Sequence, residues 1–445
     1  MPGEAGEPKS LYQLVPAEPA EPPEPPEPPE GAIIYNLHLT AEQLEIRDTV
    51  RRFVRDEVKP VALRPSRLEP FAKPLLADVL AVASNMGLRA LALSEAHGGA
   101  GADTLTACIV IEELAQGDPD IAMVLAHTAV LARLVFDAGQ PAAQQNSYLF
   151  DFIENSDFHL AFAGRNAEAG LAAGYHRTDS AKPAPAITAA KNAAGDWVIN
   201  GGAINGGVIN GEALVAANAG VAKLFVVAAS SADGDISLLV PRDTVGLSVQ
   251  EVSGERGGNT LRWGHGAPGK VSFNHCTVPA SAVLSGDSDI QRQYAQRVSP
   301  LIAAANIGVG QAAFEAAIDY TKLRRQGGKK IIEHQAIGTF LADMAIKLDT
   351  ARNLVWKAAW ALDHTEAIAD RSVPGLPLHH MARAHTSELM VEVTERAAEC
   401  FGAMGVMRDM PLQKYVDDAL MFKHSEIGVA ATKLLVAEAI AGFAR

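Results

Sequence analysis

One carboxylate near the C-terminus has surroundings that suit a general base. Glu426 comes just after a helical apolar pattern that begins at Pro411, and an Ile427-Gly428 step follows it. A carboxylate at the end of a buried helix is more basic than an exposed one, so it can take a proton from a substrate. Most glutamates lie on the surface, however, and a solvated acidic residue explains the same stretch. The residues around Glu426 alone leave both interpretations open.

The histidines and cysteines do not indicate metal chemistry. His265 and the adjacent pair His379-His380 lack the spacing of zinc ligands. The three cysteines lie far apart without CxxC spacing, which favours a reducing compartment without disulfides. We therefore expect no metal site.

Composition excludes several classes of protein. The chain has 445 residues and a formal net charge of -14, and 48% of its residues are hydrophobic. The acidic balance argues against nucleic-acid binding, which needs a basic face. No uninterrupted apolar run reaches the roughly 18 residues of a membrane span, and the N-terminus lacks the pattern of a secretory signal. We expect a cytoplasmic protein with two or three folded domains.

The N-terminal third divides into a tail and a helical domain. Residues 1–35 are predicted to be a disordered tail rich in proline and glutamate, with no catalytic part. Residues 36–155 are predicted to form helices, the first capped by Thr40 with Gln43 completing a capping box. Further helices are expected at about 74–86, 102–116 and 119–138. The adjacent pair Glu112-Glu113 points to different faces of a helix, and we expect a solvated edge there.

Residues 156–288 are predicted to form a small antiparallel β domain. Short apolar runs separated by Gly, Asp and Asn are typical of strands and turns. The runs lie at 158–162, 186–190, 197–199, 224–229, 236–240 and 271–273. Three Ile-Asn-Gly copies between residues 198 and 211 favour a duplicated hairpin turn, because Asn-Gly suits type I′ turns.

Residues 289–445 are predicted to form a domain resembling a four-helix bundle. Ser299 and Pro300 have the residue types of an N-cap and a first helical residue, opening a long buried helix that ends near Lys322. Later helices are expected over about 333–363, up to Gly405, up to Phe422, and over 429–443. The predicted fold class is therefore α+β, with an N-terminal helical domain, a middle β domain and a C-terminal helical bundle.

Three motifs make the chain from about residue 38 to 445 resemble the acyl-CoA dehydrogenase family. The segment from Phe401 to Ala419 is similar, without a gap, to the family's FGGxG…REYP…RDA run. Residues 323–335 are similar to its R-x-x-F-G…Q run, and residues 210–227 to its NG-x-K-x-WITNGG…FVV run. The order of helical domain, β domain and helical bundle agrees with the fold of that family.

The resemblance implies a reaction and a base for it. Family members bind FAD between the β domain and the bundle, and across a subunit contact, and they oxidise the Cα–Cβ bond of an acyl-CoA thioester. A glutamate removes the α-proton, and gap-free alignment places Glu426, 27 residues after Glu399, at that position. The backbone N–H of Glu426 is then expected to bond the thioester oxygen. A second alignment, which needs a deletion, puts Phe422 at the base position.

The residues expected at the flavin depart from the family pattern. The T-E-P turn, whose donors lie near the isoalloxazine, reads Gly164-Arg165-Asn166, and W-I-T reads Val215-Ala216-Ala217. The phenylalanine of R-x-x-F-G is Gly327, and the tyrosine and glycine beside the base are Ser425 and Ile427. These replacements motivate a second hypothesis, a family member without redox chemistry.

The resemblance also assigns residues to the cofactor and the substrate. The cofactor set is Arg324, Gln326, Gln335, Glu399, Gly402, Ala217, Asn218 and Gly428, and the substrate set is Arg297, Ser299, His424 and Ser425. An arginine can pair with a diphosphate, but Arg324 also suits a surface position at a helix end. Gly402 equally suits a plain helix end. Arg297 suits either an acidic acyl tail or solvent, and His424 either tunes the base or packs.

Two functions from different classes follow. The first is α,β-dehydrogenation of an acyl-CoA or acyl-carrier thioester in fatty acid metabolism by an FAD enzyme. The resemblance implies an electron-transfer flavoprotein as electron acceptor. The second is a non-catalytic subunit that completes the site of a paralogue. A flavin monooxygenase or a lyase on the same scaffold is disfavoured by the carboxylate at 426. Family habit predicts an oligomer, either a homotetramer built as a dimer of dimers or a hetero-oligomer.

Overall fold

The computed structural model of the protein describes most of the chain between His38 and Gly442. The described stretches are residues 38–68, 74–137, 143–164, 187–201, 215–251, 264–284, 290–365, 376–407, 409–424 and 428–442. The predicted tail over residues 1–35 and most of the Ile-Asn-Gly repeat lie outside them. The described residues belong to one compact unit, Tyr35–Arg445. The predicted domain boundaries near residues 155 and 288 stay predictions.

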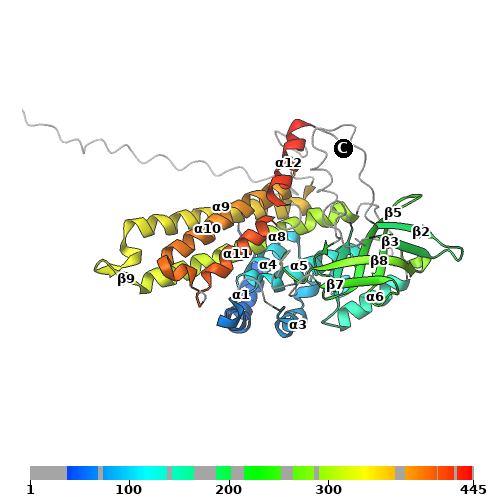
Figure 1. The fold of residues 1–445 in the computed structure, drawn as a ribbon, viewed down its shortest axis with the longest axis horizontal. Coiled ribbons are helices and arrows are strands. Elements are labelled where there is room, and N and C mark those ends of the chain that lie inside the picture. The colour runs from blue at the N-terminus through cyan, green and yellow to red at the C-terminus, as the bar shows by residue number, and fades with distance from the viewer. Residues whose placement is uncertain are drawn as a thin grey trace, which may run out of the picture. The chain divides into compact units, whose positions relative to one another are not determined.

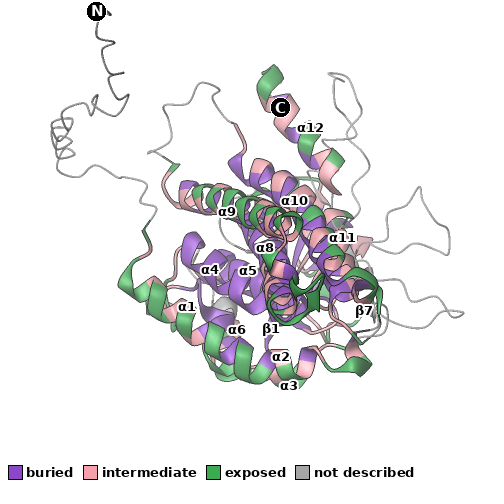
Figure 2. Cartoon of the chain, turned by 90° about the vertical axis from the view of Figure 1, so that its left-hand side faces the viewer, coloured by how far each residue is buried: buried purple, intermediate pink, exposed green. Residues whose placement is uncertain are grey.

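The N-terminal region is helical, as predicted. Its helices are α1 (Ala41–Phe53), α2 (Lys59–Ala62), α3 (Ala77–Asn85), α4 (Thr104–Ala115), α5 (Pro119–Ala132) and α6 (Ala143–Glu154). The Gln43 N–H donates to Thr40 Oγ1, and the Thr40 N–H donates to Gln43 Oε1, so the capping box is confirmed. α4 and α5 are buried along their whole length, whereas α1 presents one face to solvent (Figure 2).

The prediction of a solvated edge at Glu112 and Glu113 is wrong. Both side chains are buried, with 7% and 4% of their residue surface exposed. Arg352 Nε and Nη2 donate to Glu112 Oε1 at 2.9 and 2.8 Å, and Arg51 Nε donates to Glu113 Oε2 at 3.1 Å. The two acids do point to different faces of α4, but each face meets another helix that supplies an arginine. These partners are 240 and 62 residues away in sequence, so no local pattern reveals them.

In the described part of the middle region, eight strands form one sheet in the order β1-β5-β2-β3-β8-β4, with β6 on β5 and β7 on β8. The strands are β1 (His159–Ala163), β2 (Ile187–Lys191), β3 (Trp197–Gly201), β4 (Val215–Ala216), β5 (Ala222–Ser231), β6 (Gly234–Pro241), β7 (Leu247–Glu251) and β8 (Gly269–Val278). All six predicted strands are present, and β4 and β7 were not predicted.

The sheet is not wholly antiparallel, which corrects the prediction. β5 runs parallel to both β1 and β2, while the other pairings within the sheet are antiparallel. Strands that follow each other closely, such as β5 and β6, must return antiparallel through a short turn. β1 and β5 are far apart in sequence, so their direction depends on how the intervening chain crosses, which local patterns do not specify.

The sheet contributes one face to the helical core. Leu160 of β1 lies beside Leu224 of β5, and both belong to the apolar core that also contains α4, α5 and α8. The alternate residues Ala161 and Phe225 point to the opposite face and form a second apolar cluster. This alternation follows from the period of two in a strand. In Figure 1 the strands gather beside α5, which contacts β1.

The C-terminal region is helical, and the predicted helices are confirmed. One of them, α8, begins earlier than predicted. Its helices are α8 (Ile290–Leu323), α9 (Gln335–Asp363), α10 (Leu378–Phe401), α11 (Leu412–His424) and α12 (Gly428–Ala441). α8 begins at Ile290, so Pro300 lies inside the helix and Ser299 is not an N-cap. A proline inside a helix costs about 3 kcal/mol. Pro300 is buried among apolar residues of α8, and this packing offsets the cost.

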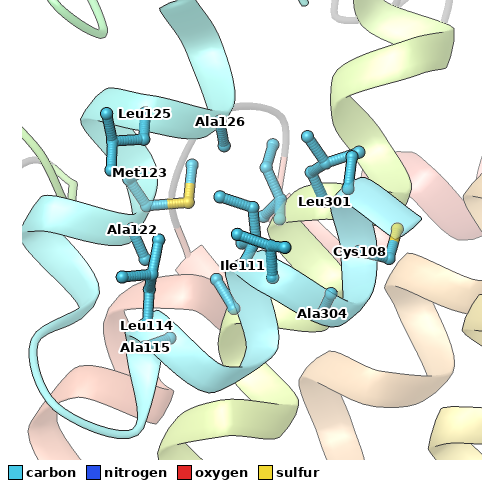
Figure 3. Close-up of a cluster of buried hydrophobic side chains, with 14 of the residues drawn as sticks. Cys108, Ile111, Leu114, Ala115, Ala122, Met123, Leu125, Ala126, Leu301 and Ala304 are labelled. Carbon is cyan, nitrogen blue, oxygen red and sulfur yellow. The ribbon is translucent and has the colours of Figure 1, made fainter. Parts of the chain in front are cut away.

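The helices of the two regions share one apolar core. Figure 3 shows side chains of α4, α5 and α8 meeting, among them Ile111 and Leu301. At Gly308 the backbone of α8 approaches α4 so closely that a Cβ would lie 2.3 Å from the Glu112 carbonyl oxygen. Two helical stretches, Pro119–Asp137 and Ile290–Leu323, are long and apolar enough to cross a membrane, but 94% and 72% of their apolar windows are buried inside the protein. Both are therefore core helices of this fold.

Two buried histidines are expected to make the fold sensitive to acid. Burial, together with the nearby charge of Arg89, lowers the pKa of His159 to about 3, and burial with His380 lowers that of His379 to about 3. The unfolded chain takes up these protons near pH 6.5, whereas the folded chain does not. The free energy of unfolding should therefore fall as pH drops from about 7 to about 4, by up to ~1.4 kcal/mol per pH unit and histidine.

Urea unfolding at pH 7, 6 and 5 measures this slope. His379→Gln should lose stability at pH 7 but show a shallower acid slope, while the exposed His38→Gln should keep the native slope. An unchanged slope in both His379→Gln and His159→Gln would contradict the assignment of the acid sensitivity to these two side chains.

Candidate active site

Glu426 lies between two helices that the structure describes. α11 ends at His424, which is exposed, and α12 begins at Gly428 with a positive φ of 67°. Ser425, Glu426 and Ile427 themselves lie outside the described residues. What the structure defines is therefore how the two flanking helices are held.

A buried ion pair lies within α11. Lys414 Nζ donates to Asp418 Oδ2 one turn along the helix, and only 3% and 1% of the two side chains are exposed. Burial lowers the pKa of Lys414, but the charges of Asp418 and Asp118 outweigh it and raise the pKa overall. Asp118 is the N-cap of α5 and lies 3.8 Å from the guanidinium of Arg67. Burial, followed by the charge of Asp120, raises the pKa of Asp118.

His265 connects the β region to both sets of helices. Its Nδ1 lies 3.1 Å from Asp120 Oδ1 on α5, and its Nε2 lies 3.0 Å from the Asp418 carbonyl oxygen on α11. Its ring packs on Phe422 with 4.2 Å between centroids. The Gly266 N–H also donates to Asp120 Oδ1, at 3.1 Å. The network brings together residues that the sequence analysis did not connect, because the sequence offers no signal beyond the individual residue types.

An aromatic group stands at the position expected to carry a hydroxyl toward the flavin. The ring of Phe162 lies over Gly164, so that a Cβ on this glycine would be 2.7 Å from Cε1 and Cζ of the ring. Phe162 stacks on Tyr294 of α8 with 4.8 Å between centroids. Tyr294 Oη is 2.6 Å from Nδ1 of His127 on α5. The space that a threonine side chain would need at residue 164 is thus filled by the ring.

Asn218, which follows strand β4, connects to α5 and to β1. Its buried amide nitrogen donates to the carbonyl oxygens of Val124 and Leu160 at 2.9 and 3.2 Å, and to Thr128 Oγ1 at 3.2 Å. Its Oδ1 has no hydrogen-bond partner among the described residues. The neighbouring Ala217 is half-buried and brings no side-chain donor.

The residues expected at the other half of the cofactor are brought to one end of the bundle. Tyr320 of α8 stacks on Phe401 of α10 at 4.1 Å, so Arg324 and Gly402, which follow these residues, lie at the same end. Gln326 lies in a small hairpin, and its carbonyl oxygen is 3.1 Å from Nε2 of His334, next to Gln335. All these cofactor residues and Glu399 are exposed.

Two glycines at this end have different structural roles. Gly402 ends α10 with a positive φ of 57°, and a Cβ there would meet nothing within 4 Å. Gly405, by contrast, packs against α10, where a Cβ would lie 2.3 Å from the Ala398 carbonyl oxygen. Gly402 therefore leaves its outer side open to a ligand, while Gly405 is required by packing.

Two residues of the proposed substrate set, Arg297 and Ser299, lie in different surroundings. Arg297 is not simply solvated, because its Nη1 lies 3.4 Å from Asp363 Oδ1, which Arg133 also approaches at 3.7 Å. The other oxygen of Asp363 accepts from the Thr104 N–H at 2.7 Å. Burial, followed by the charge of Arg133, lowers the pKa of Arg297. Ser299 is buried within the bundle, and its hydroxyl donates to the His379 carbonyl oxygen at 3.4 Å.

Comparison with known proteins gives matches at both helical regions. Residues 40–155 match the family model for the acyl-CoA dehydrogenase N-terminal domain, and residues 280–440 match that for the C-terminal domain. A probable acyl-CoA dehydrogenase of Mycobacterium leprae is 28% identical over 86% of this chain and 90% of its own.

Solved structures share the fold. Butyryl-CoA dehydrogenase from Megasphaera elsdenii has a TM-score of 0.72 at 22% identity, covering 92% of this chain and 100% of its own. A glutaryl-CoA dehydrogenase from Mycobacterium smegmatis, solved in complex with FADH2, has a TM-score of 0.69 at 18% identity, covering 92% and 96%.

Gly164 and Phe162 are expected to depend on each other. Gly164→Ala should lower the free energy of unfolding by about 1–3 kcal/mol, because the new methyl group meets the ring. Phe162→Leu should relieve that clash. The loss of unfolding free energy in the double variant should therefore be smaller than the sum of the losses in the two single variants. Denaturant unfolding measures all three variants. Gly338→Ala, where a Cβ meets nothing within 4 Å, is the control; additive effects at residues 162 and 164 would contradict the coupling.

Proposed function

The chain belongs to the acyl-CoA dehydrogenase family, and from this premise we propose that it oxidises the Cα–Cβ bond of an acyl thioester. In this proposal Glu426 removes the α-proton and FAD receives the hydride from Cβ. The observation that carries the proposal is the match of both family models to the two helical regions, on either side of a sheet with the family's fold.

The chemistry assigned to Glu426 follows from the acidity of its substrate. The thioester carbonyl lowers the pKa of the α-proton, and a carboxylate withdrawn from water is a strong enough base to remove it. The backbone N–H at Glu426 would donate to the thioester oxygen as negative charge develops there. The contact of His265 with the Asp418 carbonyl oxygen supports the proposal, because it connects the β region to α11, and this helix ends two residues before Glu426.

The described residues suit FAD at two places, which would hold the two halves of a cofactor that crosses a subunit contact, because about 30 residues of α8 separate Tyr294 at the first place from Arg324 at the second. The unpartnered Oδ1 of Asn218 is a buried acceptor that suits an N–H or hydroxyl of the cofactor. Arg324 is exposed at the same end of the bundle as the open side of Gly402, and its guanidinium suits a diphosphate. When bound, FAD supplies the two-electron acceptor for the hydride. Gln326, Gln335, Glu399, Ala217 and Gly428 complete the proposed cofactor set.

On the substrate side we assign Arg297, His424 and Ser425, with Ser299 supporting the helix behind them. Arg297 and Arg133 share the single carboxylate of Asp363, so this cluster keeps a net positive charge. Such a charge favours a polar or anionic group on the acyl chain. His424, exposed at the end of α11, is proposed to line the entrance beside the base.

A second function is favoured by one specific observation. The ring of Phe162 fills the space over Gly164, and Ala216 and Ala217 add no side-chain donors. Weak flavin retention would follow from this arrangement. In that case the chain would act as a subunit that completes the site of a paralogous partner, rather than as an enzyme by itself. We propose an oligomer for either function, and an electron-transfer flavoprotein as electron acceptor for the first.

The first experiment is a visible absorption spectrum of the purified protein, repeated after addition of FAD and dialysis. The dehydrogenase proposal expects flavin bands that an acyl-CoA bleaches. In Glu426→Gln the bands should remain, while the bleaching rate should fall by about 10²- to 10⁴-fold, since the amide cannot accept the α-proton. Glu395→Gln, an exposed change on α10, is the control and should bleach like the native protein.

The two functions predict opposite spectra. A colourless protein that takes up no FAD would exclude the dehydrogenase function for the chain alone and favour the subunit function. Flavin bands that bleach equally fast in Glu426→Gln would leave the family chemistry intact but assign the base to another residue.

A further inference from the structure

We propose that His265 is a positioning residue that holds the end of α11, and with it the segment that carries Glu426, against α5. The inference rests on the proposed function for the role of Glu426. The contacts that carry it are those of the described residues Asp120, Asp418 and Phe422.

His265 holds α11 at two points on one face. It bonds the Asp418 carbonyl oxygen through Nε2, and its ring packs on Phe422, four residues later. Residues four apart lie one above the other on a helix, so both contacts come from the same side. Phe422 is itself four residues before Glu426. We call the contacts of His265 with Asp120, Asp418 and Phe422 the clamp. On α11 it acts within the eight residues before the proposed base.

The bond to Asp418 acts on the backbone of α11. A helical carbonyl has a second lone pair that remains available after its bond within the helix. A carbonyl oxygen can only accept, so Nε2 of His265 must carry a hydrogen. A contact to the main chain fixes the position and rotation of the helix whatever side chains it carries.

The other side of the clamp is rigid. Asp120 lies in the first turn of α5, whose residues from Pro119 to Ala132 are all buried. The Asp120 carboxylate also accepts from the Gly266 N–H, which ties down the residue after His265. The charged group at the ring is Asp120 of α5. The same helices carry two further ion pairs, one between Arg67 and Asp118, the N-cap of α5, and one between Lys414 and Asp418 of α11.

Two amide variants separate the two bonds of His265. A glutamine places its amide nitrogen about where Nε2 lies and can still donate to Asp418, whereas an asparagine reaches only to the position of Nδ1. Both variants remove the ring. A purely structural role of the ring predicts similar effects of both variants, but a positioning bond from Nε2 to α11 predicts that His265→Gln retains more function than His265→Asn.

The experiment combines hydrogen exchange with kinetics on the full chain. In His265→Asn, backbone amides of residues 422–430 should exchange at least about tenfold faster than in the native protein. The rate of flavin reduction and of α-proton exchange in the acyl thioester should fall about 10- to 100-fold, with KM changed less than about threefold. His265→Gln keeps the bond to Asp418 but loses the ring contact with Phe422 and the bond to Asp120, so it should lie between His265→Asn and the native protein in all three readouts.

A partly buried histidine–aspartate pair provides the matched control. His97 Nδ1 lies 2.8 Å from Asp137 Oδ1, away from α11, so His97→Asn should leave exchange over 422–430 and the kinetics unchanged. Equal behaviour of His265→Asn and His265→Gln, or native exchange in both, would overturn the clamp. If no acyl thioester reduces the native protein's flavin, the proposed function fails, while exchange over 422–430 still decides whether His265 holds this segment.

Discussion

The arrangement of the protein depends on a buried ion pair at the point where its three regions meet. Lys414 and Asp418 are almost inaccessible to water on one face of α11. Removing two charges from water is costly, and their attraction offsets this cost only when neighbouring polar groups complete the arrangement. Asp118 contributes its charge from the N-terminal helices, and His265 of the β region bonds the backbone carbonyl of Asp418 beside the pair. Groups from all three regions thus meet at α11.

The apolar core imposes the complementary constraint. α4 and α5 are buried on every side, so they must be covered by the sheet, by α8 and by the outer helices. Close approach is possible because Gly308 brings the backbone of α8 against that of α4. One face of the sheet joins this core through Leu160 and Leu224. Charged groups such as Glu112 enter the core only where an arginine of another helix meets them.

The functional groups lie at the ends of these rigid elements. Glu426 follows α11, Arg324 follows α8, and Gly402 follows α10. Placing reactive or binding residues at helix ends leaves them accessible while the buried helices fix their positions. The Phe162–Tyr294 stack lies instead at the junction of β1 and α8. There the Phe162 ring occupies the space that a threonine side chain at residue 164 would need.

The sequence by itself determined most of the helical and strand segments, their order and the family, because hydrophobic periodicity and short motifs are local properties. It also determined the Thr40 capping box, which spans only four positions. Only the tertiary structure decided the parallel pairing of β5, the helical position of Pro300 and the burial of Glu112. It alone brought His265 between Asp120 and Asp418, across 145 and 153 residues of chain. Contacts at such separations depend on how whole elements pack, and no local pattern encodes that.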